Sequence, residues 1–81
     1  MNLTDSQRNI LRNALGLSQW TTVPTRNYIP GGIARYSPDD VTALIRAKYL
    51  TVRKIVGQTV TMHYEITDAG RDAVMQPKEE V

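Results

Sequence analysis

The stretch HYEITDAGRDAVM, residues 63–75, takes the chain from a strand into a helix without a connecting loop. Alternating apolar and polar residues up to Ile66 are typical of a half-buried strand, and Thr67 is a good N-cap for a helix beginning at Asp68. The helix then holds Gly70 in its first turn, where glycine costs about 1 kcal/mol relative to alanine. We therefore expect Gly70 to lie against another backbone, closer than a side chain would permit.

A β-hairpin is predicted before this helix. Its first strand is TVRKIV, residues 51–56, and its second alternates with Val60, Met62, Tyr64 and Ile66 expected to point inward. A two-residue turn at Gly57-Gln58 would leave Leu50 and Val52 on the opposite face, because a shift of one residue reverses every side chain. A three-residue connection with a bulge places them on the same face, so we predict that register.

Two further helices are predicted from their end signals. Thr4 and Gln7 fit a capping box, and Gly16 suits a left-handed stop, which together predict a helix over residues 5–15. Ser37 as N-cap and Pro38 at the first position predict a second helix over residues 38–48.

The connection between these helices, residues 17–36, keeps no helical period. It contains Pro24, Pro30, Gly31 and Gly32, which interrupt regular structure. A structureless connection of this length is unusual in a compact domain. We expect its apolar side chains to pack, and the connection to contain either a short helical turn or an extra strand, with TTV the best strand candidate. The apolar residues in question are Trp20, Val23, Tyr28 and Ile29.

Composition limits the classes of function. The 81 residues include no cysteine, which excludes disulfides and thiolate metal sites, and fits a reducing compartment. No basic stretch followed by an apolar run opens the chain, and no apolar run could span a bilayer, so we expect a cytoplasmic protein without membrane contact. We predict one domain over residues 1–75 and a flexible acidic tail over residues 76–81.

Charge is unevenly distributed along the chain. Residues 1–60 carry a net +5, from eight Arg and Lys against three Asp, and residues 61–81 carry a net −3. This imbalance is compatible with binding to nucleic acid or to an acidic protein, and a solvated surface explains it equally well.

Enzymatic chemistry has little support in the sequence. His63 is the only histidine, and no Ser, Cys or acidic residue stands at motif spacing from it. One histidine and scattered carboxylates provide no metal ligand set. We expect no enzymatic activity, no cofactor, no metal and no small-molecule ligand.

Two segments carry a resemblance to a known family. LIRAKYLTVRK, residues 44–54, and YEITDAGRDAV, residues 64–74, resemble the recognition helix, wing hairpin and final-helix motif of MarR-like winged helix-turn-helix proteins. NLTDSQRNILR, residues 2–12, and TRNYI, residues 25–29, are similar to short phage or prophage proteins of unknown function. The resemblance implies an α+β fold: a small winged-helix-like domain of three helices with a β-hairpin wing in its C-terminal half.

The chain departs from the family pattern at several points. Lys48 stands where the family has a glycine before the wing, and no middle helix of the helix-turn-helix is visible in residues 17–36. Long dimerisation helices are also missing. The resemblance makes residues 38–48 the recognition helix, with Asp39 and Asp40 at the end that would approach phosphates. Acidic residues there disfavour DNA, although carboxylates at this position also stabilise a helix without any function.

Five residues are candidates for nucleic-acid binding. Arg53 and Lys54 lie where the resemblance places basic residues of a wing, and Arg46 faces outward on the second helix; a solvated hairpin edge explains Arg53 and Lys54 equally well. Arg26 and Arg35 belong to a basic and aromatic cluster with Tyr28 and Tyr36, in which core packing is the alternative role of the tyrosines. We expect a small phage-derived regulatory protein that binds double-stranded DNA. The alternative is a protein-protein interaction module, for example a phage protein acting on a host or virion component, that reuses the winged fold without binding DNA.

Overall fold

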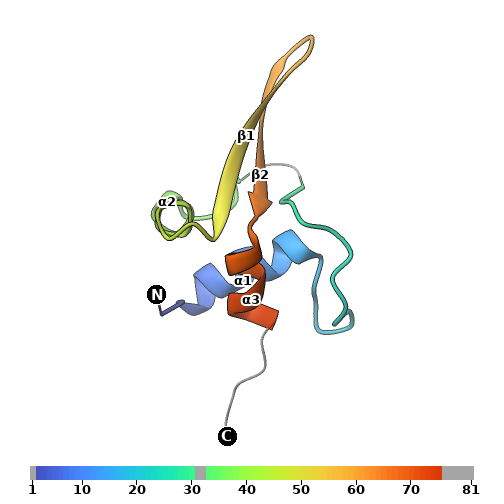
Figure 1. Ribbon diagram of the computed structural model, residues 1–81, viewed down its shortest axis with the longest axis vertical. Coiled ribbons are helices and arrows are strands. Elements are labelled where there is room, and N and C mark those ends of the chain that lie inside the picture. The colour runs from blue at the N-terminus through green and yellow to red at the C-terminus, as the bar shows by residue number, and fades with distance from the viewer. Residues whose placement is uncertain (1, 31–32, 76–81) are drawn as a thin grey trace, which may run out of the picture.

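The computed structural model describes residues 2–30 and 33–75, which form an α+β fold of three helices and a two-stranded antiparallel hairpin. The chain order is α1 (Asp5–Leu15), α2 (Pro38–Arg46), β1 (Leu50–Val56), β2 (Val60–Ile66) and α3 (Asp68–Met75). The helices gather around the base of the hairpin, which projects away from them (Figure 1). The tail expected over residues 76–81 lies outside the described residues. Within the described residues, no helix is long and apolar enough to cross a membrane.

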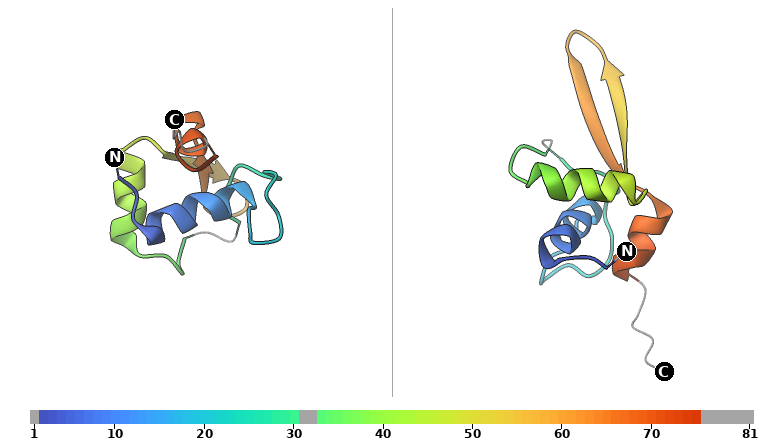
Figure 2. Two further views of the ribbon diagram at one scale, coloured as in Figure 1. Left: turned by 90° about the horizontal axis from the view of Figure 1, so that it is seen from below. Right: turned by 90° about the vertical axis from the view of Figure 1, so that its left-hand side faces the viewer.

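A single apolar core holds the helices to the base of the hairpin. The apolar side of α1 supplies four residues, α2 supplies two, and the hairpin supplies the residues at its open end. Figure 2 shows α2 lying across this end of the hairpin. The buried apolar residues are Ile10, Leu11, Ala14, Leu15, Ile29, Val41, Leu44, Leu50 and Ile66.

The helix ends follow the sequence signals, with one difference. Thr4 and Gln7 form both bonds of the capping box, and Gly16 is left-handed with φ 78°, so the prediction for α1 is confirmed. Pro38 begins α2 as expected, but α2 ends at Arg46 instead of residue 48. The reason is that Lys48 adopts a left-handed conformation with φ 67°, which a helix cannot continue through.

The register of the hairpin matches the prediction, whereas the bulge does not occur. Leu50 pairs with Ile66 and Val56 with Val60, which leaves the predicted three-residue connection 57–59. Every position between these pairs is matched, and no residue of the connection has a positive φ, so the expected bulge is wrong. Val60 and Met62 lie on the predicted face of the hairpin, but they are exposed and not buried, because the core ends at Tyr64.

The connection between α1 and α2 contains a short strand-like segment at a different place from the one predicted. Tyr28 pairs with Glu65 on the outer edge of β2, and Ile29 is buried in the core. The predicted TTV strand is wrong, because residues 21–23 make no strand pairing. Trp20 and Val23 were expected to pack and instead are 84% and 69% exposed. The described part of this connection contains no helix, so the middle helix of a helix-turn-helix is missing there.

The strand-to-helix junction has the close approach expected from the sequence. The Thr67 backbone N–H donates to the carbonyl of Tyr49 at 3.0 Å, and its hydroxyl donates to the carbonyl of Lys48 at 2.6 Å. The same hydroxyl accepts from the backbone N–H of Gly70 at 3.0 Å, which caps α3. Gly70 is buried against the backbone of Tyr49, so the prediction for this glycine is confirmed.

Candidate nucleic-acid interface

The projecting hairpin carries two exposed basic residues, Arg53 and Lys54, midway along β1. Because successive side chains of a strand point to opposite faces, these two residues lie on opposite faces of the hairpin. Arg53 shares its face with His63 and Glu65, whereas Lys54 shares the other face with Met62. The hairpin therefore presents one cation on each side.

A polar cluster holds Arg53 in place. Its Nη2 atom donates to Oε2 of Glu65 at 2.6 Å, and Nε2 of His63 lies 3.2 Å from the same oxygen. The ring of Tyr28 stacks on the ring of His63, with 4.9 Å between their centres. An exposed ion pair of this kind contributes about 0–1 kcal/mol, so the guanidinium stays available to a stronger anion.

Lys54, in contrast to Arg53, has no charged or hydrogen-bonding side-chain partner among the described residues. It is exposed, and it forms no ion pair or side-chain hydrogen bond within residues 2–30 and 33–75. Its cross-strand neighbour is Met62, which carries no charge. A phosphate approaching this face would therefore meet a cation with no competing carboxylate opposite it.

Helix α2 presents mixed charge. Arg46 is exposed at the last position of the helix, and Asp39 is exposed in its first turn. Asp40 is half-buried, and its Oδ1 atom accepts from Nε2 of Gln7 at 3.4 Å. Asp40 thus links α2 to α1, while the dipole at the helix N-terminus favours both carboxylates.

The two candidate residues in the connection differ in burial: Arg26 is half-buried and Arg35 is exposed. Arg26 is half-buried at the end of α1, where its Nη2 atom donates to the carbonyl and to Oδ1 of Asn13 at 2.7 and 2.8 Å. Asn13 also donates through Nδ2 to the hydroxyl of Tyr36. Arg35 is exposed, with its guanidinium carbon 5.2 Å from the centre of the Tyr36 ring. Arg26 is occupied in holding the connection to α1, so we leave it out of the interface.

The predicted basic and aromatic cluster is divided in the structure. Arg26 and Tyr36 meet at Asn13, whereas Tyr28 lies on the hairpin against His63. The stacking of Tyr28 thus contributes to the polar face of the hairpin and not to a separate cluster in the connection.

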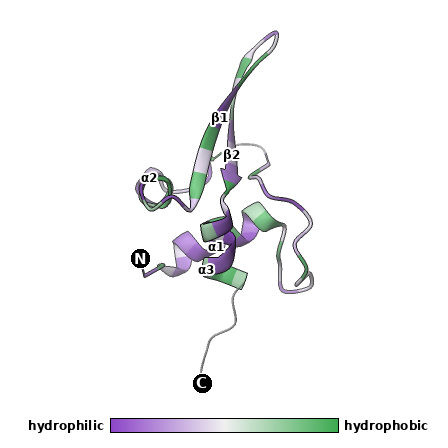
Figure 3. Cartoon of the chain, in the orientation of Figure 1, coloured by the Kyte–Doolittle hydropathy of each residue, from purple (hydrophilic) through white to green (hydrophobic). Residues whose placement is uncertain are grey.

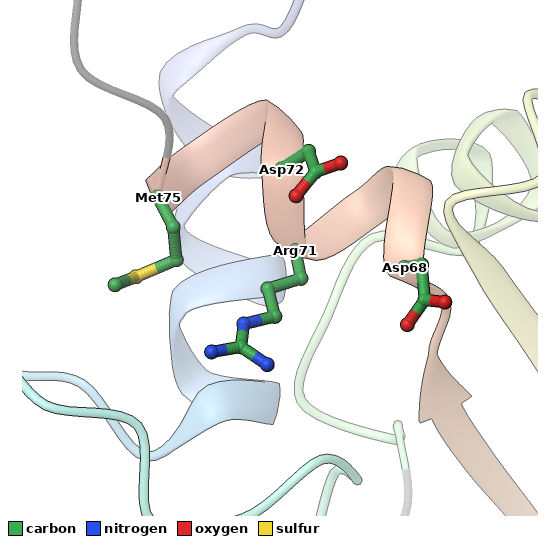
Figure 4. Close-up of a pocket in the computed structure, with 4 residues that line it drawn as sticks. All are labelled: Asp68, Arg71, Asp72 and Met75. Carbon is green, nitrogen blue, oxygen red and sulfur yellow. The ribbon is translucent and has the colours of Figure 1, made fainter.

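A hollow on α3 is also lined by charged residues. Asp68, Arg71, Asp72 and Met75 line it, all from successive turns of one helix (Figure 4). Within the described residues, no group of three His, Cys, Asp or Glu is placed to hold a metal ion. Charges of both signs alternate in this hollow, which gives it no preference for an anion such as phosphate.

No protein-family model matches the chain, and neither a curated protein nor a solved structure matches it. The winged-helix resemblance stays a prediction based on the residues quoted above.

Glu65 is a partner of Arg53 that the sequence did not reveal. The sequence places Glu65 on the polar face of β2, but its distance from Arg53 depends on the register of the hairpin. With the observed register Arg53 pairs with His63, and Glu65 is the diagonal neighbour two residues further along β2. Such diagonal pairs lie within reach of long side chains.

Proposed function

We propose that this protein binds double-stranded DNA through its β-hairpin, as a small winged-helix-like regulatory protein of phage type. The observation that carries the proposal is the projecting hairpin, with Arg53 exposed on one face and Lys54 exposed on the other. A hairpin that enters a groove with a cation on each face can neutralise a phosphate on each of the two flanking backbones.

Helix α2 has a secondary part in the proposed complex. In winged-helix proteins the leading end of the recognition helix approaches the groove, yet here that end carries Asp39, which would repel phosphate. The opposite end carries Arg46, and β1 begins four residues later. We propose that Arg46 contacts the backbone beside the wing and that α2 does not read bases with its leading end.

The size of the contact gives the proposal a quantitative test. Binding that neutralises about three phosphates should show a slope of roughly −2.7 in a plot of log affinity against log salt, since each phosphate contributes about −0.9. Affinity for a random-sequence duplex should be measured by fluorescence anisotropy at several salt concentrations. Absence of binding at low salt, or binding that does not weaken as salt rises, would contradict the proposal.

A second function, binding to a protein partner, is favoured by one observation. Trp20 is 84% exposed on the connection between α1 and α2, and Val23 beside it is 69% exposed. Tryptophan is enriched among the residues that dominate protein interfaces. Under this alternative, Trp20→Ala should abolish a complex with a host or virion protein, and the wild-type chain should show no salt-dependent affinity for duplex DNA.

A further inference from the structure

The outer half of the hairpin continues the core face of the sheet into solvent. On this face Leu50 and Ile66 are buried and Val52 and Tyr64 are half-buried. Further out the apolar side chains are exposed, and Figure 3 shows hydrophobic residues still present towards the tip. The exposed fractions are 46% for Met62, 59% for Val60 and 70% for Val56.

Among residues 2–30 and 33–75, the outer edge of β2 pairs with another segment only near the core. The N–H of Ile29 donates to the carbonyl of Tyr64, and the N–H of Ile66 donates to the carbonyl of Asn27, both at 2.9 Å. In an antiparallel strand every second residue directs its N–H and C=O to the same edge. The backbone groups of Met62 and Val60 therefore point to this edge too, where no described residue pairs with them.

The two edges of the hairpin differ in charge. The open edge of β1 carries Arg53 and Lys54, and such charges are a common means of preventing edge-to-edge pairing. Residues 55–62, in contrast, contain no charged side chain. A second copy of the same strand can approach the outer half of β2 without repulsion, whereas two copies of β1 would bring like charges together.

We propose that two copies of this chain pair antiparallel through the outer half of β2, about a two-fold axis at Thr61. Val60 of one copy then lies opposite Met62 of the other, and these residues exchange the backbone hydrogen bonds that the open edge offers. An axis at Met62 would place Val60 opposite Tyr64, whose carbonyl already accepts from Ile29. The Thr61 axis is therefore the one that the free backbone groups fit.

Pairing of this kind gives the outer half of the hairpin the neighbouring strands that it lacks in the single chain. A two-stranded hairpin without further strands is marginally stable in water, and the dimer would join two of them into one sheet of twice the width. The surface is self-complementary, as an interface with two-fold symmetry requires. The inference is independent of DNA binding, because Arg53 and Lys54 stay on the outer strands, at the sides of the joined sheet.

Sedimentation of the full chain over a wide range of concentration tests the proposal. We expect the wild-type chain to form a dimer and Val60→Lys to be monomeric, because the two lysines of the paired copies meet as diagonal neighbours across the paired edge, whereas within the hairpin each faces uncharged Val56. Val56→Lys is the matched control: it adds the same charge on the same exposed face but on β1, away from the pairing edge, and should still dimerise. Circular dichroism of both variants checks that the fold is kept.

Single cysteines provide a second test, since the chain has none of its own. Thr61→Cys should form a disulfide-linked dimer on mild oxidation, because residues at the axis face each other at a distance that suits a disulfide. Thr51→Cys is the control, an exposed threonine on the same sheet face but on β1, and should remain monomeric.

Each remaining outcome contradicts the proposal. A wild-type chain that is monomeric throughout excludes the dimer. A dimer that survives Val60→Lys uses another surface, and a dimer lost in both lysine variants pairs through the apolar face and not through the edge. Equal crosslinking of the two cysteine variants would indicate random collision.

Discussion

Gly70 lies directly against the backbone of Tyr49, so that a Cβ atom added to Gly70 would be 2.3 Å from the Tyr49 carbonyl oxygen and 2.9 Å from Cγ1 of Ile66. The oxygen belongs to the backbone at the start of β1 and cannot move aside as a flexible side chain could. This contact, together with the bonds of Thr67, fixes the direction in which α3 leaves the sheet.

Replacement of Gly70 by alanine should therefore destabilise the protein by about 1–3 kcal/mol, the usual cost of overpacking. Helix propensity alone would give a gain of about 1 kcal/mol, so the sign of the change separates the two effects. Ala69→Gly, at the exposed neighbouring position, is the control and should cost about 1 kcal/mol. Urea denaturation measures both, and a Gly70→Ala variant as stable as the wild type would disprove the close contact.

Thr67→Val should cost about 1–2 kcal/mol, because it removes the bond to the Lys48 carbonyl and the cap on the Gly70 N–H while it keeps the shape of the side chain. Thr67→Ser retains the hydroxyl and should lose markedly less. Thermal unfolding of the two variants gives the comparison. Equal losses would mean that the methyl group, and not the hydroxyl, stabilises the junction.

Lys48→Gly should stabilise the protein by about 1 kcal/mol, because a left-handed conformation costs an L-residue roughly 1–2 kcal/mol and costs glycine little. Lys48→Ala removes the same charge but keeps the Cβ atom, so it should give no comparable gain. If both variants shift the unfolding midpoint equally, charge and not backbone conformation is responsible.

The sequence predicted the elements that have local signals. Capping residues and turn residues located α1, the start of α2 and the start of α3, and alternation with Leu50 and Val52 gave the register of the hairpin. The position of the isolated bridge at Tyr28 could not be predicted, because Asn27 and Ile29 join β2 through backbone bonds that leave no pattern in the side chains.

Alternation also could not show where the core ends. Val60 and Met62 continue the apolar pattern of Tyr64 and Ile66, but three short helices cover only the base of the hairpin. Arg53 and Lys54 are exposed on the hairpin as expected, whereas the carboxylate beside Arg53 depends on a diagonal contact across the strands. The bonds of Arg26 to Asn13 could not be predicted, because the two residues are 13 positions apart in the sequence.

Glu65→Gln should tighten binding to duplex DNA by a factor of about 1.4 to 5 at low salt, which corresponds to the roughly 0.2–1 kcal/mol of an exposed ion pair. The substitution removes the carboxylate that Arg53 now contacts and leaves the guanidinium free for phosphate. Asp72→Asn on α3 makes the same change in net charge at an exposed site away from the wing and should have a smaller effect. Fluorescence anisotropy titrations measure the duplex affinity of both variants. A larger gain in affinity for Asp72→Asn than for Glu65→Gln would contradict the proposed interface.

The most direct test of the proposed interface is the salt dependence of duplex binding in the Arg53→Ala/Lys54→Ala double variant. Loss of two phosphate contacts should weaken binding to all sequences and reduce the salt slope by about 2. Arg8→Ala/Arg71→Ala removes two exposed cations outside the hairpin and controls for net charge; its slope should stay close to that of the wild type. A double variant of the wing with unchanged affinity and slope at low salt would contradict DNA binding through the hairpin and favour a protein partner.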